Sequence, residues 1–159
     1  MNRRCIVFSL CSMMLVLALF SCHAPFAVGV ESLRFKVEQV AWGTSTDAPI
    51  EIEPGDTNVP LTVDIGNLSN KTLKRVYGTL ELNSGGPFVD YFSGTYNASA
   101  TGVPLQAGDI FNQTGEISPA GSFAFTFRLD IARTARSGYY PHRIAMEYLF
   151  KWENNSWVV

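Results

Sequence analysis

A strict alternation of apolar and polar or small side chains in residues 123–131 restricts the fold more than any other feature of the chain. Apolar residues occupy every second position: Phe123, Phe125, Phe127, Leu129 and Ile131. Successive side chains of a strand point to opposite faces, whereas a helix places apolar residues three and four positions apart. The segment therefore predicts a strand with one face in a core, and its three phenylalanines are expected to anchor that core.

The same two-residue period recurs along much of the chain, between turns rich in Gly, Pro and Asn. We expect strands over residues 33–42, 59–65, 76–82, 88–91, 109–117, 123–131, 139–152 and 156–159, and a loop over 97–108. Short strands at this spacing favour an all-β fold, an immunoglobulin-like antiparallel β-sandwich of about seven strands. A small closed barrel is the alternative.

Residues 1–29 differ in character from the rest of the chain. Arg3 and Arg4 precede an uncharged apolar run from Cys5 to Cys22, and the small residues 27–29 follow. This layout is typical of a secretory signal peptide, so we expect an N-terminal hydrophobic leader helix. The leader could be cleaved, retained as a membrane anchor with its arginines in the cytoplasm, or lipidated at Cys22. In each case residues 30–159 form one domain outside the cytoplasm, either secreted or at the cell surface.

The positions of the cysteines and the net charge limit the metal sites, disulfides and partners expected for that domain. All three cysteines, Cys5, Cys11 and Cys22, lie in the leader, so residues 30–159 contain no disulfide or cysteine metal site. The whole chain has a net charge of −2, and setting aside Arg3 and Arg4 leaves −4. Nucleic acids and anionic membranes attract concentrated positive charge, so neither is an expected partner, and any membrane association is assigned to the leader. No cofactor or metal is expected.

Five sites carry the N-glycosylation sequence Asn-x-Ser/Thr. They are Asn67, Asn70, Asn97, Asn112 and Asn154. The sequence predicts glycans at one or more of them in an exported protein. The alternative is that Asn, Ser and Thr simply form polar turns.

Residues 30–159 contain no evident catalytic set. His142 is the one histidine of this region, no cysteine accompanies it, and no Gly-x-Ser-x-Gly phrase is present. His142 is expected to pack on a strand face, and the protein is not expected to be an enzyme. Four carboxylates could coordinate Ca²⁺ or only solvate a turn, and the second reading is preferred because their spacing matches no known loop. These are Glu51, Glu53, Asp56 and Asp64.

An aromatic group and the final segment are the candidate contact sites. The aromatic group lies in an irregular, glycine-containing stretch and comprises Phe88, Tyr91, Phe92 and Tyr96. Exposed rings there could stack on a sugar or contact a partner protein, or the rings could cover the edge of the sandwich. The last strand, residues 156–159, is too short to pair with the whole strand before it. An open edge is therefore predicted, to which a second copy or a partner chain could add a strand.

Three phrases resemble the archaeal S-layer-domain-like surface proteins, which are akin to CARDB-type immunoglobulin-like repeats. They are residues 37–43 (VEQVAWG), 53–63 (EPGDTNVPLTV) and 132–140 (ARTARSGYY). The resemblance covers nearly all of residues 31–150, in a single copy. It implies an extracytoplasmic protein of surface architecture or adhesion, with no catalytic residues.

The sequence therefore predicts a non-enzymatic, extracytoplasmic interaction module of the cell surface or envelope, acting through its sheet edge and loops. Two alternatives stay open. One is a carbohydrate-binding module that uses the aromatic group, and the other is a membrane-tethered accessory subunit of a transporter or secretion complex.

Overall fold

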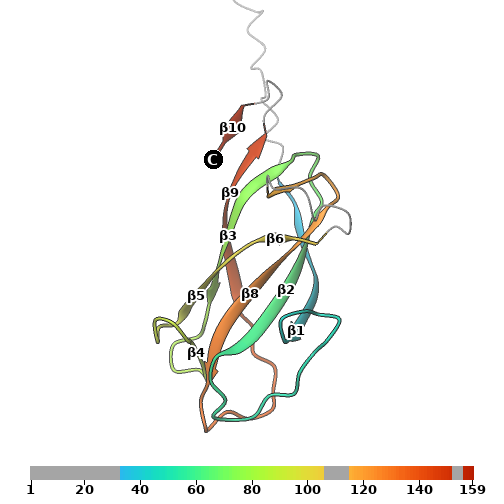
Figure 1. Ribbon diagram of the computed structural model, residues 1–159. Coiled ribbons are helices and arrows are strands. Elements are labelled where there is room, and N and C mark those ends of the chain that lie inside the picture. The colour runs from blue at the N-terminus through green and yellow to red at the C-terminus, as the bar shows by residue number, and fades with distance from the viewer. Residues whose placement is uncertain (1–32, 106–114, 152–155) are drawn as a thin grey trace, which may run out of the picture. The chain divides into compact units, whose positions relative to one another are not determined.

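The computed structural model describes residues 33–105, 115–151 and 156–159, all within one compact unit, Ser32–Val159. The described residues form ten strands and no helix (Figure 1). The strands are β1 (Phe35–Trp42), β2 (Val59–Asn67), β3 (Leu73–Glu81), β4 (Phe88–Asp90), β5 (Asn97–Thr101), β6 (Val103–Pro104), β7 (Glu116–Ile117), β8 (Ser122–Ile131), β9 (Arg143–Lys151) and β10 (Trp157–Val158). The expected all-β fold is confirmed. The predicted leader helix lies outside the described residues.

The strands form two separate antiparallel sheets. In the first sheet the order is β1-β2-β8-β4, and β6 also pairs with β8. In the second the order is β10-β9-β3-β5, and β7 also pairs with β3. No pairing joins the two sheets among the described residues, so the closed-barrel alternative is wrong. The described residues contain ten strands, two more than the eight segments expected from the sequence, because β5 and β6 lie in the stretch expected to be a loop.

The core between the sheets is built around β8, as its alternation predicts. Phe123, Phe125 and Phe127 are all fully buried. The ring of Phe125 lies 5.4 Å from that of Phe123 and 5.8 Å from that of Phe127. Offset and edge contacts of this kind add to the free energy gained by burying the rings. The inward side chains of β8 are well covered because β2 pairs with β8 on one side and β4 and β6 pair with it on the other.

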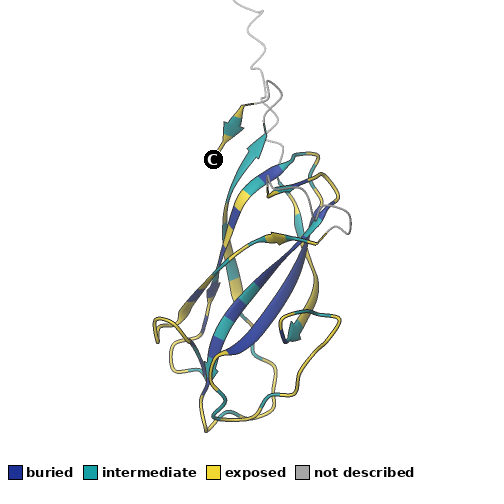
Figure 2. Ribbon diagram, viewed as in Figure 1, coloured by how far each residue is buried: buried dark blue, intermediate teal, exposed yellow. Residues whose placement is uncertain are grey.

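Both faces of β2 are buried, not only the face toward the core (Figure 2). The outward residues Thr62 and Asp64 are covered by the segment that follows β1. Thr62 Oγ1 donates a hydrogen bond to the Gly43 carbonyl at 2.6 Å, and Thr46 Oγ1 donates to Asp64 Oδ2. These bonds pair the Thr62 hydroxyl and Asp64 Oδ2, which would otherwise be costly to bury, whereas Asp64 Oδ1 has no partner among the described residues. β2 is an interior strand of its sheet, between β1 and β8.

Two sequence predictions are wrong in their bounds. The loop expected over residues 97–108 contains β5 and β6. The apolar pattern of β5 is weak because only the small residues Ala98 and Ala100 pack toward the core. The strand expected over residues 139–152 begins at Arg143 instead. Pro141 lacks a backbone N–H and disfavours regular pairing around it. Of the strand expected over 109–117, only β7 lies within the described residues.

Candidate interaction site

The edge of β9 that faces away from β3 is open along most of its length. β10 pairs with β9 only through Trp157 opposite Lys151 and Val158 opposite Phe150. On its other side β9 pairs with β3 from Arg143 to Phe150. Among the described residues, no strand pairs with the outer edge of β9 between Arg143 and Leu149. In an antiparallel pair, alternate residues direct N–H and C=O groups to each side, so this edge presents unpaired backbone donors and acceptors.

The inward side chains of β9 are incompletely covered as a result. Ile144, Met146 and Tyr148 pack against the core, yet each is only half-buried. On β8 the equivalent inward residues are almost wholly buried. Figure 2 shows the contrast, with β9 in teal and yellow where β2 is dark blue. A strand added beside β9 would bury more of these apolar surfaces.

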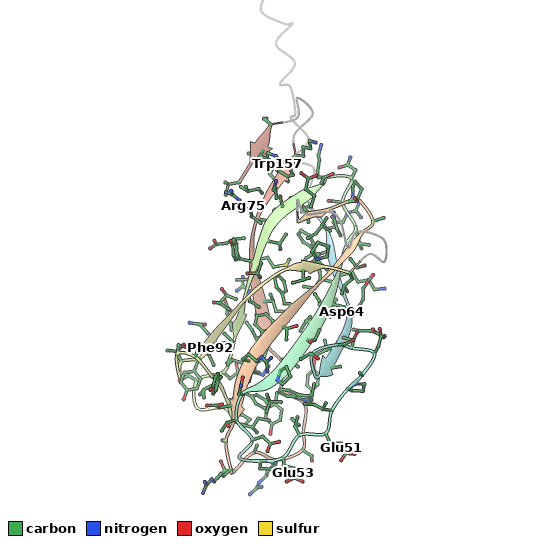
Figure 3. All side chains as sticks on the ribbon, viewed as in Figure 1. Glu51, Glu53, Asp64, Arg75, Phe92 and Trp157 are labelled. Atoms are coloured by element: carbon green, nitrogen blue, oxygen red, sulfur yellow. The ribbon has the colours of Figure 1, made fainter. Side chains whose placement is uncertain are left out.

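β10 is held in place although it is very short. The Lys74 ammonium lies 5.4 Å from the centroid of the Trp157 ring, and that of Lys151 lies 5.9 Å away. Both are within the range of cation–π attraction. Figure 3 shows Trp157 at the end of β9 that is remote from Glu53. β10 therefore closes one end of the edge and leaves the rest free.

The edge of β1, in the first sheet, differs from that of β9. β1, at the edge of the first sheet, carries a β-bulge between Val37 and Gln39, which makes Glu38 an extra residue. Bulges and charges on edge strands hinder pairing with other chains. The bulge in the β3–β9 pair places its extra residue on β3, where Arg75 has a φ of 51°. β9 itself is regular, and a regular edge accepts another strand most readily.

The two edge strands β1 and β9 approach each other across the sandwich. The ring of Phe35 on β1 lies 5.4 Å from that of Tyr148 on β9 and 6.3 Å from that of Phe123 in the core. Val37 and Val40 on β1 are more than half exposed. The same side of the sandwich thus carries the open outer edge of β9 and exposed apolar side chains of β1.

A cavity of about 490 Å³ lies next to the first residues of β9. Its walls are largely aromatic and aliphatic, and include Trp42, Phe88, Ile131, Tyr140 and His142. The Phe88 ring holds this group together, because it lies 5.7 Å from Trp42, 5.2 Å from Tyr140 and 5.8 Å from His142. The cavity is apolar and open to solvent at one end of the strand edge.

His142 packs in this cavity wall, as the sequence predicts for a residue on a strand face. Both of its ring nitrogens are shielded from solvent, and neither has a hydrogen-bond partner among the described residues. Ser137 lines the same cavity, but no hydrogen bond joins it to the imidazole. A nucleophile–base pair requires that bond, so the present geometry does not form one.

The predicted aromatic group is divided by the structure. Phe88 is buried on β4, where it contributes to the cavity wall. Tyr91 and Phe92 are 42% and 77% exposed, and their ring planes meet at 69° with centroids 5.2 Å apart. Figure 3 shows Phe92 projecting from the β4–β5 connection. Tyr96, 37% exposed, lies just before β5. The exposed rings form an edge-to-face pair and not a flat platform.

The four carboxylates considered for Ca²⁺ do not converge. Glu51 and Glu53 lie in the segment before β2, and Asp64 lies on β2 apart from both (Figure 3). Asp56 Oδ2 accepts a hydrogen bond from the Glu53 backbone N–H at 2.7 Å, as in a local turn. No cluster of three or more metal-ligating side chains occurs in the described part of the chain. Asp56 thus stabilises a local turn, whereas Asp64 on β2 accepts a hydrogen bond from Thr46.

The predicted glycosylation sites differ in accessibility. Asn67 is fully buried, and its Nδ2 donates to the carbonyl oxygens of Lys71 at 2.9 Å and Ser118 at 3.1 Å. A glycan on Nδ2 is incompatible with these bonds and with the packing around them. Asn70 and Asn97 are exposed. Asn112 and Asn154 lie outside the described residues.

No family model matches the chain, and no curated protein or solved structure matches it either. The resemblance to S-layer-domain-like surface proteins therefore stays a prediction. Within the described ranges, no helix has the length and apolar character needed to cross a bilayer. The open edge of β9 with its adjoining cavity is the feature of the described residues best suited to contact a partner.

Proposed function

We propose that this protein is an exported, non-enzymatic interaction module that receives an extended strand from a partner along the open edge of β9. The observation that carries the proposal is the pairing of β9. Its outer edge meets β10 only at Phe150 and Lys151, while its inward side chains stay half-buried. An added strand would gain backbone hydrogen bonds and bury apolar surface at once.

The order of the strands supports an immunoglobulin-like sandwich. Such sandwiches place strands A, B, E and D in one sheet and G, F and C in the other, with C′ beside C in the variable type. The orders β1-β2-β8 and β10-β9-β3-β5 match A-B-E and G-F-C-C′. The short strand β6, which follows β5 and pairs with β8, fits strand D in chain order, whereas β4, which also pairs with β8 but precedes β5 in the chain, is an addition to that arrangement. β10 then occupies the position of strand G, which normally covers strand F. In this proposal a partner supplies the part of strand G that β10 does not provide.

Site-specific photocross-linking tests the proposal in cells. A photoreactive benzoylphenylalanine in place of Ala145, which is exposed in the middle of β9, should capture a polypeptide. The matched control carries the same group in place of Lys36, which is exposed on the bulged edge strand β1. Strong cross-linking from position 145 and little from position 36 is the expected result. Equal capture at both positions, or none at 145, would contradict the proposal.

Export and a surface role rest on the leader and on the resemblance to surface proteins. Intact-mass analysis of the secreted and membrane fractions tests them, since one measurement reports cleavage, lipidation at Cys22 and glycans together. We expect a mature chain that lacks the leader and carries added glycan mass, which peptide mapping should place at Asn70 or Asn97 and not at Asn67. A mass that begins at Met1 in the membrane fraction would instead favour the tethered accessory subunit.

Carbohydrate binding is the second candidate, supported by the exposure of Tyr91 and Phe92. Sugar rings stack best on aromatic faces that are freely exposed. Phe88 is buried, and the other two rings stand edge to face, so the available platform is small. A glycan array with the Phe92→Ala variant as control separates the two functions: binding lost on substitution would favour the carbohydrate module.

A further inference from the structure

We infer that the strand that pairs with β9 comes from a second copy of this chain, so that two β9 strands join antiparallel about a two-fold axis. The inference rests on the proposed function and names the partner for the same edge. Its basis is the order of charged and apolar residues along β9, which is self-complementary in one register.

The β9 strand of each copy has an inward and an outward face, and this limits the registers in which the two β9 strands can pair. Residues directly opposite in an antiparallel pair lie on the same face of the sheet. The inward residues Ile144, Met146 and Tyr148 of one copy must therefore meet inward residues of the other, or apolar groups would be turned to solvent. Only registers that place even-numbered residues opposite even-numbered ones satisfy this condition.

Charge selects one of these registers. When Ala145 meets Ala145 of the second copy, Arg143 of each copy lies opposite Glu147 of the other, and Ile144 lies opposite Met146. A shift that centres the pair on Glu147 would place the two Glu147 side chains together. A shift that centres it on Met146 would place Arg143 opposite Leu149. Opposite charges directly across a strand pair stabilise it, and like charges destabilise it.

The side chains that would meet are available for this contact. The Arg143 side chain is 80% exposed, and its Nε lies 4.0 Å from Glu81 Oε2 on the neighbouring strand β3. The planar guanidinium carries five N–H donors, so it can bind a second carboxylate without losing the first. Glu147 and Ala145 are exposed on the same face of β9. In the dimer, Arg143 would lie between Glu81 of its own chain and Glu147 of the other.

The open edge of β9 is long enough for this pairing. β10 covers β9 at Phe150 and Lys151. At the other end the chain leaves the sheet before Arg143, next to Pro141, which cannot donate a backbone hydrogen bond. In the chosen register the paired residues run from Arg143 to Glu147 of each copy, which lies inside these limits.

Charge reversal tests the inference in the purified exported protein by sedimentation velocity. The wild type should be a dimer. Arg143→Glu and Glu147→Arg should each raise the dimer dissociation constant about tenfold or more, because each places like charges opposite one another twice. The double variant Arg143→Glu/Glu147→Arg should dimerise like the wild type. An equimolar mixture of the two single variants should form a heterodimer, because every opposed pair is then complementary.

Two controls separate this effect from misfolding and from general charge. Lys36→Glu makes the same charge change as Arg143→Glu but on β1, and it should leave the dimer intact. Recovery of the dimer on mixing the single variants requires that both are folded. The inference is overturned if the wild type is monomeric at all concentrations. It is also overturned if the dimer dissociation constant does not change in the Arg143→Glu and Glu147→Arg variants.

Cross-linking at position 145 distinguishes failure of this inference from failure of the proposed function. A product of twice the mass of the chain supports self-pairing. A product with a different polypeptide, together with a monomeric wild type, overturns self-pairing but leaves the strand-receiving function standing. If position 145 gives no cross-linked product and all backbone amides of β9 are protected from hydrogen exchange in the monomer, both self-pairing and the strand-receiving function are overturned.

Discussion

Gly78 on β3 lies directly against the ring of Phe125 on β8, on the opposite sheet. A Cβ atom placed on Gly78 would be 2.8 Å from both Cε1 and Cζ of that ring. Real Cβ atoms do not approach other atoms so closely, so the two sheets pack at this separation only because residue 78 has no side chain.

Gly78→Ala should therefore destabilise the domain by overpacking. Phe125 is fully buried between Phe123 and Phe127, so its ring has little room to move. We expect a loss of about 1–3 kcal/mol in the free energy of unfolding, measured by urea denaturation. Gly138→Ala is the matched control, because its nearest neighbour is the Tyr140 ring at 3.7 Å, an ordinary contact.

A double-mutant cycle shows whether the ring contact is the cause. Phe125→Leu alone should destabilise the core, but the two substitutions together should cost less than the sum of their separate costs. Strictly additive costs would show that Gly78 matters for another reason.

This glycine also shows what the sequence could and could not predict. The alternation in the strand expected over residues 76–82 predicts that Gly78 shares the inward face with Val76 and Leu80, and all three are buried. Nothing in the alternation indicates that Phe125 of the other sheet lies against it, because the pairing of faces depends on how the two sheets are stacked. A strong alternation of apolar residues, as in β8, indicates which face of a strand is buried. Contacts across the core depend in addition on how the two sheets pack against each other.

The buried Asn67 stabilises the turn between β2 and β3. Its Nδ2 donates to the carbonyls of Lys71 and Ser118, and its Oδ1 accepts from the backbone N–H and the hydroxyl of Ser69. Asn67→Ala would remove four hydrogen bonds made by a fully buried side chain, at a cost of about 2–3 kcal/mol. Urea denaturation measures the loss.

Asn83→Ala is the matched control for Asn67. Asn83 is exposed, and its Nδ2 makes one long bond of 3.4 Å to the Pro141 carbonyl. That substitution should change the free energy of unfolding by less than about 0.5 kcal/mol. Similar losses for the two variants would contradict the role given to Asn67.

The sequence predicts Asn67 as a glycosylation site or as part of a polar turn, and its hydrogen bonds to Ser69 and Lys71 agree with the turn. The motif Asn-x-Ser describes a local pattern and carries no information on burial. The same limit applies to β5, where Ala98 is fully buried although alanine gives little apolar signal. The aromatic group is divided for a related reason, since Phe88 lies on β4 and is buried, whereas Phe92 lies in the turn after β4 and is exposed.

The open edge of β9 predicts an alternating pattern of hydrogen exchange. In dilute solution, where the monomer predominates, amides directed toward β3 should exchange slowly, and every second amide between Arg143 and Leu149 should exchange fast. The amides of β2 from Leu61 to Gly66 serve as the control, because β2 pairs with β1 on one side and with β8 on the other over these residues. Nuclear magnetic resonance resolves the individual amides. Uniform protection along β9 would show that the edge is covered.

The imidazole of His142 is expected to reduce the stability of the fold. Both ring nitrogens are buried without hydrogen-bond partners among the described residues, while the ring itself lies 5.8 Å from Phe88 in an edge contact. Leaving buried donors and acceptors unpaired costs free energy, and an apolar ring of similar shape removes that cost. His142→Phe should therefore raise the free energy of unfolding by about 1 kcal/mol, and the adjoining cavity offers room for the larger ring.

His142→Gln tests whether polarity or ring shape decides the outcome. Glutamine keeps polar atoms at the site and loses the edge contact with Phe88, so it should not stabilise the domain. If thermal unfolding instead showed that His142→Phe lowers stability as much as His142→Gln, the imidazole nitrogens must have a partner in solution. The cavity wall would then be a polar site, and a ligand that hydrogen-bonds to His142 would have to be considered beside the strand that we place along β9.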